Sequence, residues 1–389
     1  MDMWLMIFSA VFCSLWIFIY LFLMYTGRNL TFFHNLVVTS PKLWPKLSII
    51  VPACNEEQHI EQAVQTLIAQ DYPELEIILV NDRSTDNTGE IIDSLASDDA
   101  RIKAVHIDTL PDNWLGKVHA LSEGKKHVTG NWLLITDADI HYAPGLLRKA
   151  VAYVEEKKID HLALMPNVEM NSFWLEMAIS TFGLLFLLTT RAAGINKPGS
   201  KAVIGVGAFN LVKCESFDKT PGFQWLRMET VDDMGVGLMM KNAGGQTHFV
   251  IADKDLSLGW YNSVAAMFRG LEKNLFGAGP GYSVVKLIFQ LLPLWALVVA
   301  PFIAFCSDNV WLLSLASVAT FLYVFFAIFF IRKKQSETFS LLLFPVGLIL
   351  ISLMMMWAAY RCVKNRGIDW RGTHYSIDQL RAGQRVRFK

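Results

Sequence analysis

The sequence has no net charge, few charged residues and no paired cysteine motif. Its 389 residues include 35 basic and 35 acidic side chains, so a basic surface for nucleic acid is not expected. Charged residues make up only 18% of the chain, against about 25% in soluble domains, whereas hydrophobic residues make up 53%. This balance excludes a disordered chain and an ordinary soluble domain, and it places part of the chain in a lipid bilayer.

Motifs that would indicate other chemistries are also missing. The five cysteines form no C-x-x-C pair and are odd in number, which argues against a disulfide framework and against a zinc site. The glycine-rich patterns G-x-x-x-x-G-K-[ST] and G-x-G-x-x-G do not follow the predicted strands, which disfavours a P-loop ATPase and a dinucleotide oxidoreductase. A reducing, cytosolic environment fits these cysteines.

Long uncharged runs lie at both ends of the chain. Residues 3–27 carry no charge and exceed the roughly 20 residues that cross a bilayer core. Asp2 precedes this run and no A-x-A site follows it, so a retained anchor over residues 1–27 is favoured over a signal peptide. Three transmembrane or re-entrant helices are predicted within residues 287–360, at 287–305, 310–331 and 339–360, the first with a kink or re-entrant turn at Pro293 and Pro301.

Basic residues give conflicting signals about topology. Arg28 follows the first anchor and Arg332 begins a basic cluster between the last two runs, so both segments are predicted to face the cytoplasm. Four spans would then place the tail at residues 361–389 outside, yet this tail has eight basic and two acidic residues. The number of spans and the side of the tail therefore stay open. We expect a multi-pass protein of the cell inner membrane with its central domain in the cytoplasm.

Between the anchors, residues 46–283 alternate short apolar strands with amphipathic helices. The strand sequences KLSIIV, LEIILV, IKAVHI and WLLIT are each followed by a helical pattern. This alternation predicts one α/β domain with a mostly parallel sheet and helices on both faces. Ligands of such sheets bind beyond the carboxyl ends of the strands, so the loops there are the places to search for chemistry.

One apolar segment inside this domain is too short to cross a bilayer. It lies within residues 173–194, with Trp174 at one end and Arg191 at the other. This pattern is typical of a helix lying in the membrane interface, and it is equally compatible with a buried core helix.

Carboxylates follow three of the predicted strands. Glu56 follows the first, Asp82 the second, and the D-x-D pair Asp137 and Asp139 the fourth. Taken singly, each carboxylate is better explained by a helix cap or a turn than by a functional role. Together at one sheet edge, Asp137 and Asp139 predict a site for Mg²⁺ or Mn²⁺, which bind jointly to protein carboxylates and substrate phosphates.

In their order along the chain, these segments resemble the family 2 inverting glycosyltransferases with the GT-A fold, over most of residues 46–283. SIIVPACNEE resembles the opening strand and P-x-x-N-E loop, VNDRSTDNT the nucleotide-binding loop, and TDAD the metal motif. LPDNWLGKVHAL resembles the G-K-x-x-A-L segment beside the donor, GVGAFNLVKCESF the acceptor-side strand, and ETVDDMGVGLMMKNAGG the E-D motif with the general base. The anchors, and Trp370-Arg371-Gly372 in the tail, further resemble ceramide, hopanoid and carotenoid glycosyltransferases.

The resemblance implies a role for each matching position. Asp233 would be the general base, with the adjacent Asp232 as the competing candidate, and Gly207 and Ala208 would lie on the acceptor side. The metal ligands would be Asp139 and Asp137. The donor-binding residues would be Pro52, Glu56, Asp82, Lys117 and Asp137.

The chain departs from the family after the predicted base. The Gln-x-x-Arg-Trp motif of the processive polymer synthases is missing, and the region reads WYNSVAAMFRGLEKNLFGAG. Arg269 and Lys273 fall four residues apart on one helix face, where they would bind the leaving diphosphate or simply flank a membrane run. Trp260 is predicted to stack on a sugar or to sit at the interface.

The leading interpretation is a hexosyltransferase that moves a sugar from a nucleotide-sugar donor, expected to be a UDP-sugar, to a hydroxylated membrane lipid. A polysaccharide synthase of the same family is weakened by the missing motif and by the small number of predicted spans. A non-catalytic membrane scaffold on this fold is the third interpretation, and the carboxylates at every motif position count against it.

Overall fold

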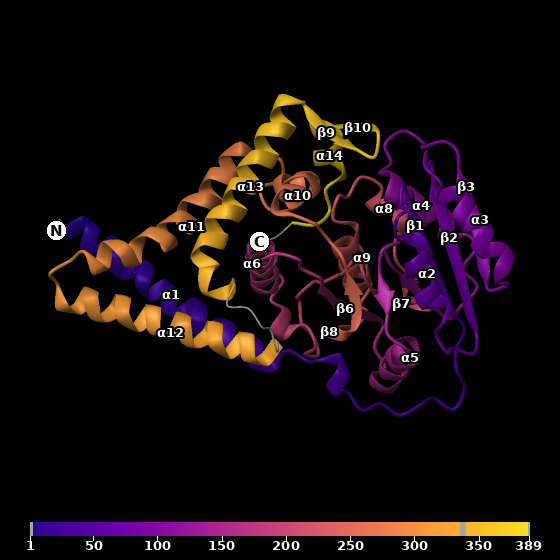
Figure 1. Cartoon of the computed structure of the whole chain (residues 1–389), viewed down its shortest axis with the longest axis horizontal. Coiled ribbons are helices and arrows are strands. Elements are labelled where there is room, and N and C mark those ends of the chain that lie inside the picture. The colour runs from indigo at the N-terminus through magenta and orange to yellow at the C-terminus, as the bar shows by residue number, and fades with distance from the viewer. Residues whose placement is uncertain (1–2, 335–339, 388–389) are drawn as a thin grey trace. The chain divides into compact units, whose positions relative to one another are not determined.

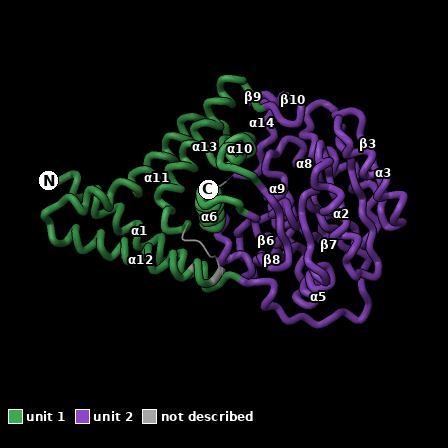
Figure 2. Tube along the Cα trace, in the orientation of Figure 1, with its two compact units in different colours: residues 1–30, 170–189, 261–368 green, residues 31–169, 190–260, 369–389 purple. Residues whose placement is uncertain are grey.

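The computed structural model describes residues 3–334 and 340–387 (Figure 1). Met1, Asp2 and residues 335–339, 388 and 389, which entered the predictions above, lie outside the described residues. The chain divides into two compact units, shown in Figure 2. The helical unit comprises Met1–Leu30, Met170–Thr189 and Tyr261–Ile368, and the sheet unit comprises Thr31–Glu169, Thr190–Trp260 and Asp369–Lys389.

The sheet unit is built on one eight-stranded sheet with the strand order β3-β2-β1-β4-β7-β6-β8-β5. Strand β1 pairs in parallel with β2 and β4, whereas β7 runs antiparallel to both of its neighbours, β4 and β6. The strands are β1 Leu47–Ala53, β2 Leu75–Asp82, β3 Ile102–Ile107, β4 Trp132–Ile135, β5 His141–Tyr142, β6 His161–Val168, β7 Asn210–Lys213 and β8 Thr247–Leu258. The predicted α/β fold is therefore confirmed, with a mixed sheet.

The helices of this unit follow the strands as the sequence predicts. Helix α2 buries Ile60, Ala63, Val64 and Leu67, a spacing of three and four residues that keeps one face toward the core. Gly124 lets α4 approach the sheet closely, because a β-carbon there would lie 2.8 Å from Ile50. The helices are α2 Ile60–Ile68, α3 Thr88–Asp98, α4 Gly116–Lys125, α5 Leu146–Lys157, α7 Cys214–Phe217, α8 Phe223–Leu226, α9 Asp232–Asn242 and α14 Ile377–Gly383.

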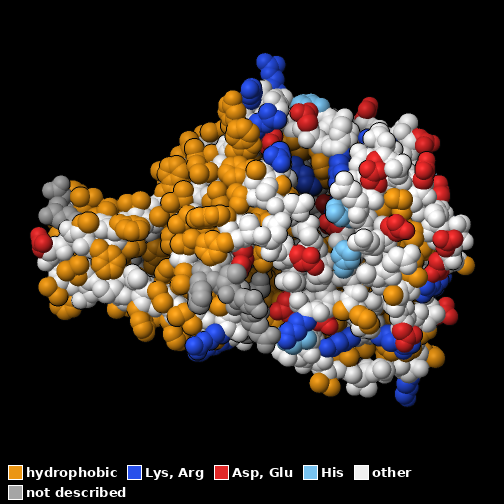
Figure 3. Space-filling view, in the orientation of Figure 1, with side chains coloured by type: hydrophobic (Ala, Val, Ile, Leu, Met, Phe, Trp, Pro, Cys, Tyr) orange, Lys and Arg blue, Asp and Glu red, His pale blue; other side chains and the backbone are white. Residues whose placement is uncertain are grey.

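The helical unit contains four helices long and apolar enough to cross a membrane among the described residues. They are Met3–Asn29, Val284–Phe305, Val310–Phe329 and Ser340–Lys364. Hydrophobic side chains cover much of this unit's surface in Figure 3, as expected for helices that face lipid. Helix α1 is Met3–Asn29, α11 Val284–Phe305, α12 Val310–Lys334 and α13 Phe344–Lys364. Pro293 and Pro301 both lie inside α11, which continues as one helix through them.

The short apolar segment forms α6, Phe173–Thr189, which belongs to the helical unit by its contacts. It packs closely against α13, since a β-carbon at Gly347 would lie 2.0 Å from the Thr181 hydroxyl. Phe173 and Trp174 are exposed at its start, as an interfacial helix would need. Its interfacial placement stays a prediction, as do the domain boundaries at 46 and 283.

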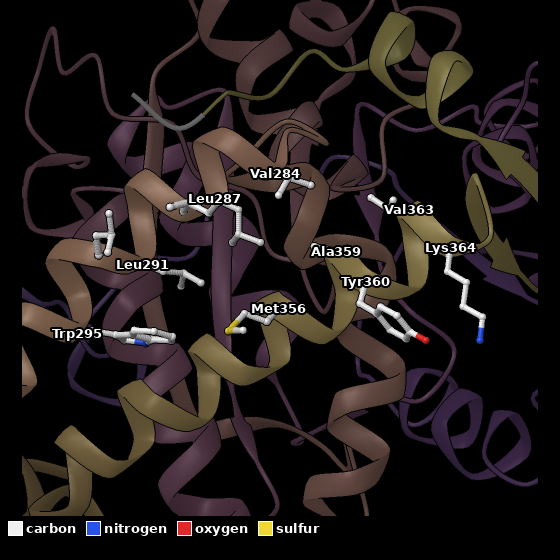
Figure 4. A pocket seen from close by; sticks show the side chains of 11 residues that line it. Val284, Leu287, Leu291, Trp295, Met356, Ala359, Tyr360, Val363 and Lys364 are labelled. Carbon is white, nitrogen blue, oxygen red and sulfur yellow. The ribbon is translucent and has the colours of Figure 1, made fainter.

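Helices α11 and α13 line an apolar groove of about 440 Å³, shown in Figure 4. Trp295 lies at one end, and Tyr360 and Lys364 lie at the other. The Lys364 ammonium is 5.6 Å from the centre of the Tyr360 ring. The rest of the lining is aliphatic or Met, from Val284, Leu287, Ile288, Leu291, Leu292, Met356, Ala359 and Val363. The shape and chemistry suit an alkyl chain.

Candidate active site

The strand-end residues predicted to bind the donor lie at one edge of the sheet. Pro52 is next to the last residue of β1, Asp82 ends β2, and Asp137 follows β4 by two residues. Because β1, β2 and β4 are parallel, their carboxyl ends meet at the same edge. The α/β topology therefore brings these three loops together.

Lys117 is the second residue of α4 and forms the centre of the site. Its ammonium nitrogen lies 2.5 Å from Oδ1 of Asp137 and 3.5 Å from Oδ2 of Asp232. Burial alone would lower the pKa of Lys117, but the two carboxylates raise it above its ordinary value. Lys117 is therefore a fixed positive charge between two acidic loops, and the sequence pattern did not distinguish this position from a solvated lysine.

Asp233, the favoured base, lies in the first turn of α9 beside the acceptor-side loop. Its Oδ2 accepts a hydrogen bond from the Gly207 amide at 3.1 Å, and its Oδ1 accepts one from the Met234 amide at 2.8 Å. Burial and the neighbouring Asp232 raise the pKa of Asp233 to about 6. The geometry thus places a carboxylate with a pKa near neutrality next to Gly207.

Gly207 lies close to Asp137, and a side chain at this position would force the Asp137 carboxylate to shift. A β-carbon there would lie 2.7 Å from Oδ2 of Asp137, so this backbone passes directly beside the carboxylate. The following residue, Ala208, accepts a hydrogen bond through its carbonyl from the Thr136 hydroxyl at 2.8 Å. Thr136 precedes Asp137, so the bond ties the acceptor-side loop to the D-x-D loop. The structure therefore brings the predicted acceptor-side, metal and base residues together.

Asp137 and Asp139 fit a divalent cation by their chemistry. Burial, together with the charges of Asp137 and Glu56, raises the pKa of Asp139 to about 7. A cation would relieve this repulsion between carboxylates. Among residues 3–334 and 340–387, no group of three or more His, Cys, Asp or Glu side chains is arranged to hold a metal. The remaining ligands would have to come from substrate oxygens and water, as is usual for Mg²⁺.

Asp82 is buried and pairs with its neighbour Arg83, whose Nε lies 2.8 Å from Oδ1. The start of α4 comes close to this pair, since a β-carbon at Gly116 would lie 2.4 Å from Oδ2 of Asp82. Glu56 donates its backbone N–H to the Thr88 hydroxyl at 2.8 Å. The first two strand-end loops and the G-K segment are therefore packed against one another.

Sequence reasoning missed one residue at this edge. Arg371, from the carboxyl-terminal tail, places its Nη2 2.6 Å from Oε1 of Glu56. Burial raises the pKa of the Glu56 carboxyl, and the Arg371 charge opposes this shift. The only signal in the sequence was the Trp370-Arg371-Gly372 pattern, which by itself carries no indication of where the tail lies.

Three further predicted site residues lie on other elements. Arg269 and Lys273 lie on α10, Val264–Ala278, which belongs to the helical unit. Trp260 lies two residues after β8, half-buried, in the sheet unit. The roles of these three residues in binding diphosphate or sugar stay predictions. The chain also contains another D-x-D pair, Asp253 and Asp255, which lies inside β8 and not after it, so it is not equivalent to Asp137 and Asp139.

Residues 48–220 match the sequence model of a family described as "Glycosyl transferase family 2". An uncharacterized glycosyltransferase from Haemophilus influenzae is 36% identical over 121 residues, which is 31% of this chain and 36% of that protein. The 4,4'-diaponeurosporenoate glycosyltransferase of Staphylococcus aureus is 33% identical over 96 residues, 25% of this chain and 24% of that protein. The chain thus spans about a third or less of the length of these relatives. Asp232 and Asp233 lie beyond the matched family segment, so their roles stay proposals.

A solved structure shares the fold over nearly the whole chain. The mannosyltransferase PcManGT from Pyrobaculum calidifontis, in complex with GDP-Man and Mn²⁺, superposes with a TM-score of 0.55 at 18% identity. The superposition covers 91% of this chain and 99% of that one. At this identity the likeness establishes the fold alone, and it confirms the predicted GT-A architecture.

Proposed function

We propose that the chain, whose residues 48–220 match the glycosyl transferase family 2 model, transfers a sugar from a nucleoside-diphosphate sugar to a hydroxylated membrane lipid. The donor is proposed to be a UDP-sugar, and the anomeric configuration to be inverted. The observation that carries the proposal is one constellation, in which Lys117 bridges Asp137 and Asp232 while Gly207 fixes the adjacent Asp233.

On the donor side, the chain's own residues supply charge where the reaction develops it. Displacing a nucleoside diphosphate leaves negative charge on the departing phosphates, and the half-buried ammonium of Lys117 would stabilise that charge. Pro52, Glu56 and Asp82 line the loops in which the nucleotide would lie. Asp137 and Asp139 would hold Mg²⁺ or Mn²⁺, which when bound neutralises the leaving diphosphate. The Mn²⁺ in the P. calidifontis mannosyltransferase supports this assignment.

On the acceptor side, Asp233 would remove the proton from the lipid hydroxyl. Its backbone hydrogen bonds hold the carboxylate in place, and its raised pKa keeps it an effective base near neutral pH. A single base without an enzyme nucleophile gives one displacement and hence inversion, by the logic that separates inverting from retaining glycosidases. Asp232 pairs with Lys117, so its charge is already engaged, which favours Asp233 as the base.

The lipid acceptor is supported by the helical unit. Four helices of spanning length would keep the enzyme at a bilayer, and the groove between α11 and α13 offers a place for an alkyl chain. The catalytic domain is proposed to face the cytoplasm, where nucleotide sugars are made. A polysaccharide synthase and a non-catalytic scaffold are the competing functions. No observation favours them over the lipid transferase.

The test is transfer by the full-length protein in nanodiscs that contain total membrane lipid. Purified protein is incubated with radiolabelled nucleotide sugars and Mg²⁺ or Mn²⁺, with Asp233→Asn as the inactive control. We expect the label to extract into organic solvent and to migrate as one discrete lipid. A ladder of products or a water-soluble polymer would indicate a polysaccharide synthase. No incorporation of label from any donor would favour a non-catalytic scaffold.

The groove provides a second, independent check of the lipid assignment. Ala359 lines the groove and is nearly buried, so Ala359→Trp would fill it. We expect this variant to lose transfer to long-chain acceptors while keeping transfer to short-chain, water-soluble analogues. Ala265, an exposed alanine on α10 of the same unit, gives the matched control Ala265→Trp. Equal activity of the Ala359 variant on both acceptors would show that the groove holds no part of the acceptor.

A further inference from the structure

The carboxyl-terminal segment of residues 369–387 returns to the sheet unit, as Figure 2 shows by its colour. Leu380 and Val386 are buried there. Glu229 accepts two backbone hydrogen bonds through Oε2, from the amides of Arg385 at 2.6 Å and Val386 at 2.9 Å. A β-carbon at Gly383 would lie 2.1 Å from the side chain of Met228, so the segment packs tightly. The carboxyl-terminal segment is therefore an integral part of the sheet unit.

This docked segment contacts the same loops that the donor site uses. The Thr373 hydroxyl accepts a hydrogen bond from Arg83, the partner of Asp82, at 3.3 Å. Tyr375 is buried beside the Gly116 backbone. Four loops meet the segment: those of Glu56, of Asp82 and Arg83, of Gly116, and of Glu229 before the Asp232-Asp233 pair.

Arg371 occupies an unusual backbone position at the tip of this segment. It and Gly372 join β9, Gly367–Trp370, to β10, Thr373–Ser376, with φ angles of 48° and 77°. Two-residue turns with both φ angles positive usually carry Asn-Gly, because a residue with a long side chain loses roughly 1 kcal/mol in the left-handed region. A strained residue at a candidate site points to a function for its side chain.

The ion pair with Glu56 does not by itself account for Arg371. The Arg371 side chain is 42% exposed, and ion pairs between exposed groups contribute little to stability, about 0–1 kcal/mol. A guanidinium presents a planar set of donors that matches phosphate oxygens. Glu56 holds that guanidinium at the mouth of the nucleotide loops, where a diphosphate would compete for it.

We infer that the carboxyl-terminal segment completes the donor site and that Arg371 binds the diphosphate of the nucleotide donor. This assignment rests on the proposed glycosyl transfer. On binding, the guanidinium exchanges the Glu56 carboxylate for phosphate oxygens, with no change in covalent bonding. The segment thereby couples the end of the chain to the first strand-end loop, 315 residues earlier.

The experiment measures binding, so it does not depend on knowing the sugar or the lipid. The full-length protein in nanodiscs with Mg²⁺ is titrated calorimetrically with UDP, GDP and dTDP, and the tightest of these is compared with its nucleoside. We expect Arg371→Ala to weaken diphosphate binding about tenfold or more, equivalent to about 1.4 kcal/mol, and to leave nucleoside binding unchanged. Arg371→Lys should bind the diphosphate with an affinity between those of the wild type and Arg371→Ala, because lysine keeps the charge but lacks the planar set of donors. Arg387, exposed in the same segment, supplies the charge-matched control Arg387→Ala, which should bind as wild type.

Each other outcome overturns the inference. Unchanged diphosphate binding by Arg371→Ala would show that Arg371 only pairs with Glu56. An equal loss for diphosphate and nucleoside, with a lowered melting temperature, would assign the residue a purely structural role. If the wild-type protein binds none of the three diphosphates, the proposed glycosyl transfer is wrong as well. In the two preceding outcomes the wild-type protein still binds a diphosphate, so they contradict only the role of Arg371.

Discussion

The indole nitrogen of Trp16 donates a hydrogen bond to the backbone carbonyl of Leu297 at 2.6 Å, between α1 and α11. Leu297 precedes Pro301 by four residues, and proline has no N–H to offer that carbonyl. In a helix that crosses a membrane, an unpaired carbonyl is costly because water is not available to it. Trp16 therefore compensates for the proline and explains how α11 stays continuous through Pro301.

We expect Trp16→Phe to lower the free energy of unfolding by about 1–2 kcal/mol, because the Leu297 carbonyl loses its donor. Pro301→Ala should relieve this loss in the double variant, since the new amide can bond Leu297 within the helix. Thermal unfolding in detergent measures both effects. Trp311, which is 85% exposed, gives the control Trp311→Phe. Additive losses in the double variant would contradict the compensation.

Asp139→Ala and Asp233→Asn should both abolish transfer, for different reasons. Loss of a metal ligand should weaken donor binding, whereas loss of the base should leave metal-dependent donor binding nearly intact while turnover falls about a hundredfold or more. Calorimetric donor titration and initial rates separate the two effects. Asp98→Asn, an exposed position on α3, serves as the control. Full activity in Asp233→Asn with an inactive Asp232→Asn would assign the base to Asp232.

The pH profile should report the environment of Asp233. Its pKa is raised to about 6, so the carboxyl is protonated below that pH and cannot accept the acceptor proton. We expect kcat/KM to be level above about pH 6 and to fall tenfold per pH unit below it. Removing the neighbouring charge in Asp232→Asn should lower the pKa of Asp233 and shift the acidic fall of kcat/KM to lower pH. An acidic limb that stays in place in that variant would mean that Asp232 does not act on the titrating group.

Orientation in the membrane can be tested through Asp98→Cys. The cysteine should resist an impermeant thiol reagent in sealed, right-side-out vesicles and should react after permeabilisation, because the sheet unit is predicted to face the cytoplasm. Cys306 is exposed and Cys54 is half-buried, so both are replaced by serine beforehand. Labelling without permeabilisation would reverse the predicted topology.

Many elements of the fold could be predicted from local patterns in the sequence. Strands such as Leu47–Ala53 and helices such as Ile60–Ile68 follow from hydrophobic spacing, because burial of one face is a property of nearby residues. The membrane candidates follow in the same way from uncharged runs. The direction of β7 did not follow, because the segment Asn210–Lys213 has the same pattern whichever way it pairs.

Part of the candidate site followed from the sequence, and part was visible only in the tertiary structure. Composition and motif order determined the class of chemistry: carboxylates after parallel strands, a lysine at a helix start and a pair of aspartates downstream. Only the tertiary structure decided that Lys117 bridges Asp137 and Asp232, and that Arg371 reaches Glu56 from the other end of the chain. Residue type and spacing indicate the backbone conformation of a short segment and which of its side chains are buried. Contacts over hundreds of residues depend on the path of the whole chain, which is set by the packing of every element at once.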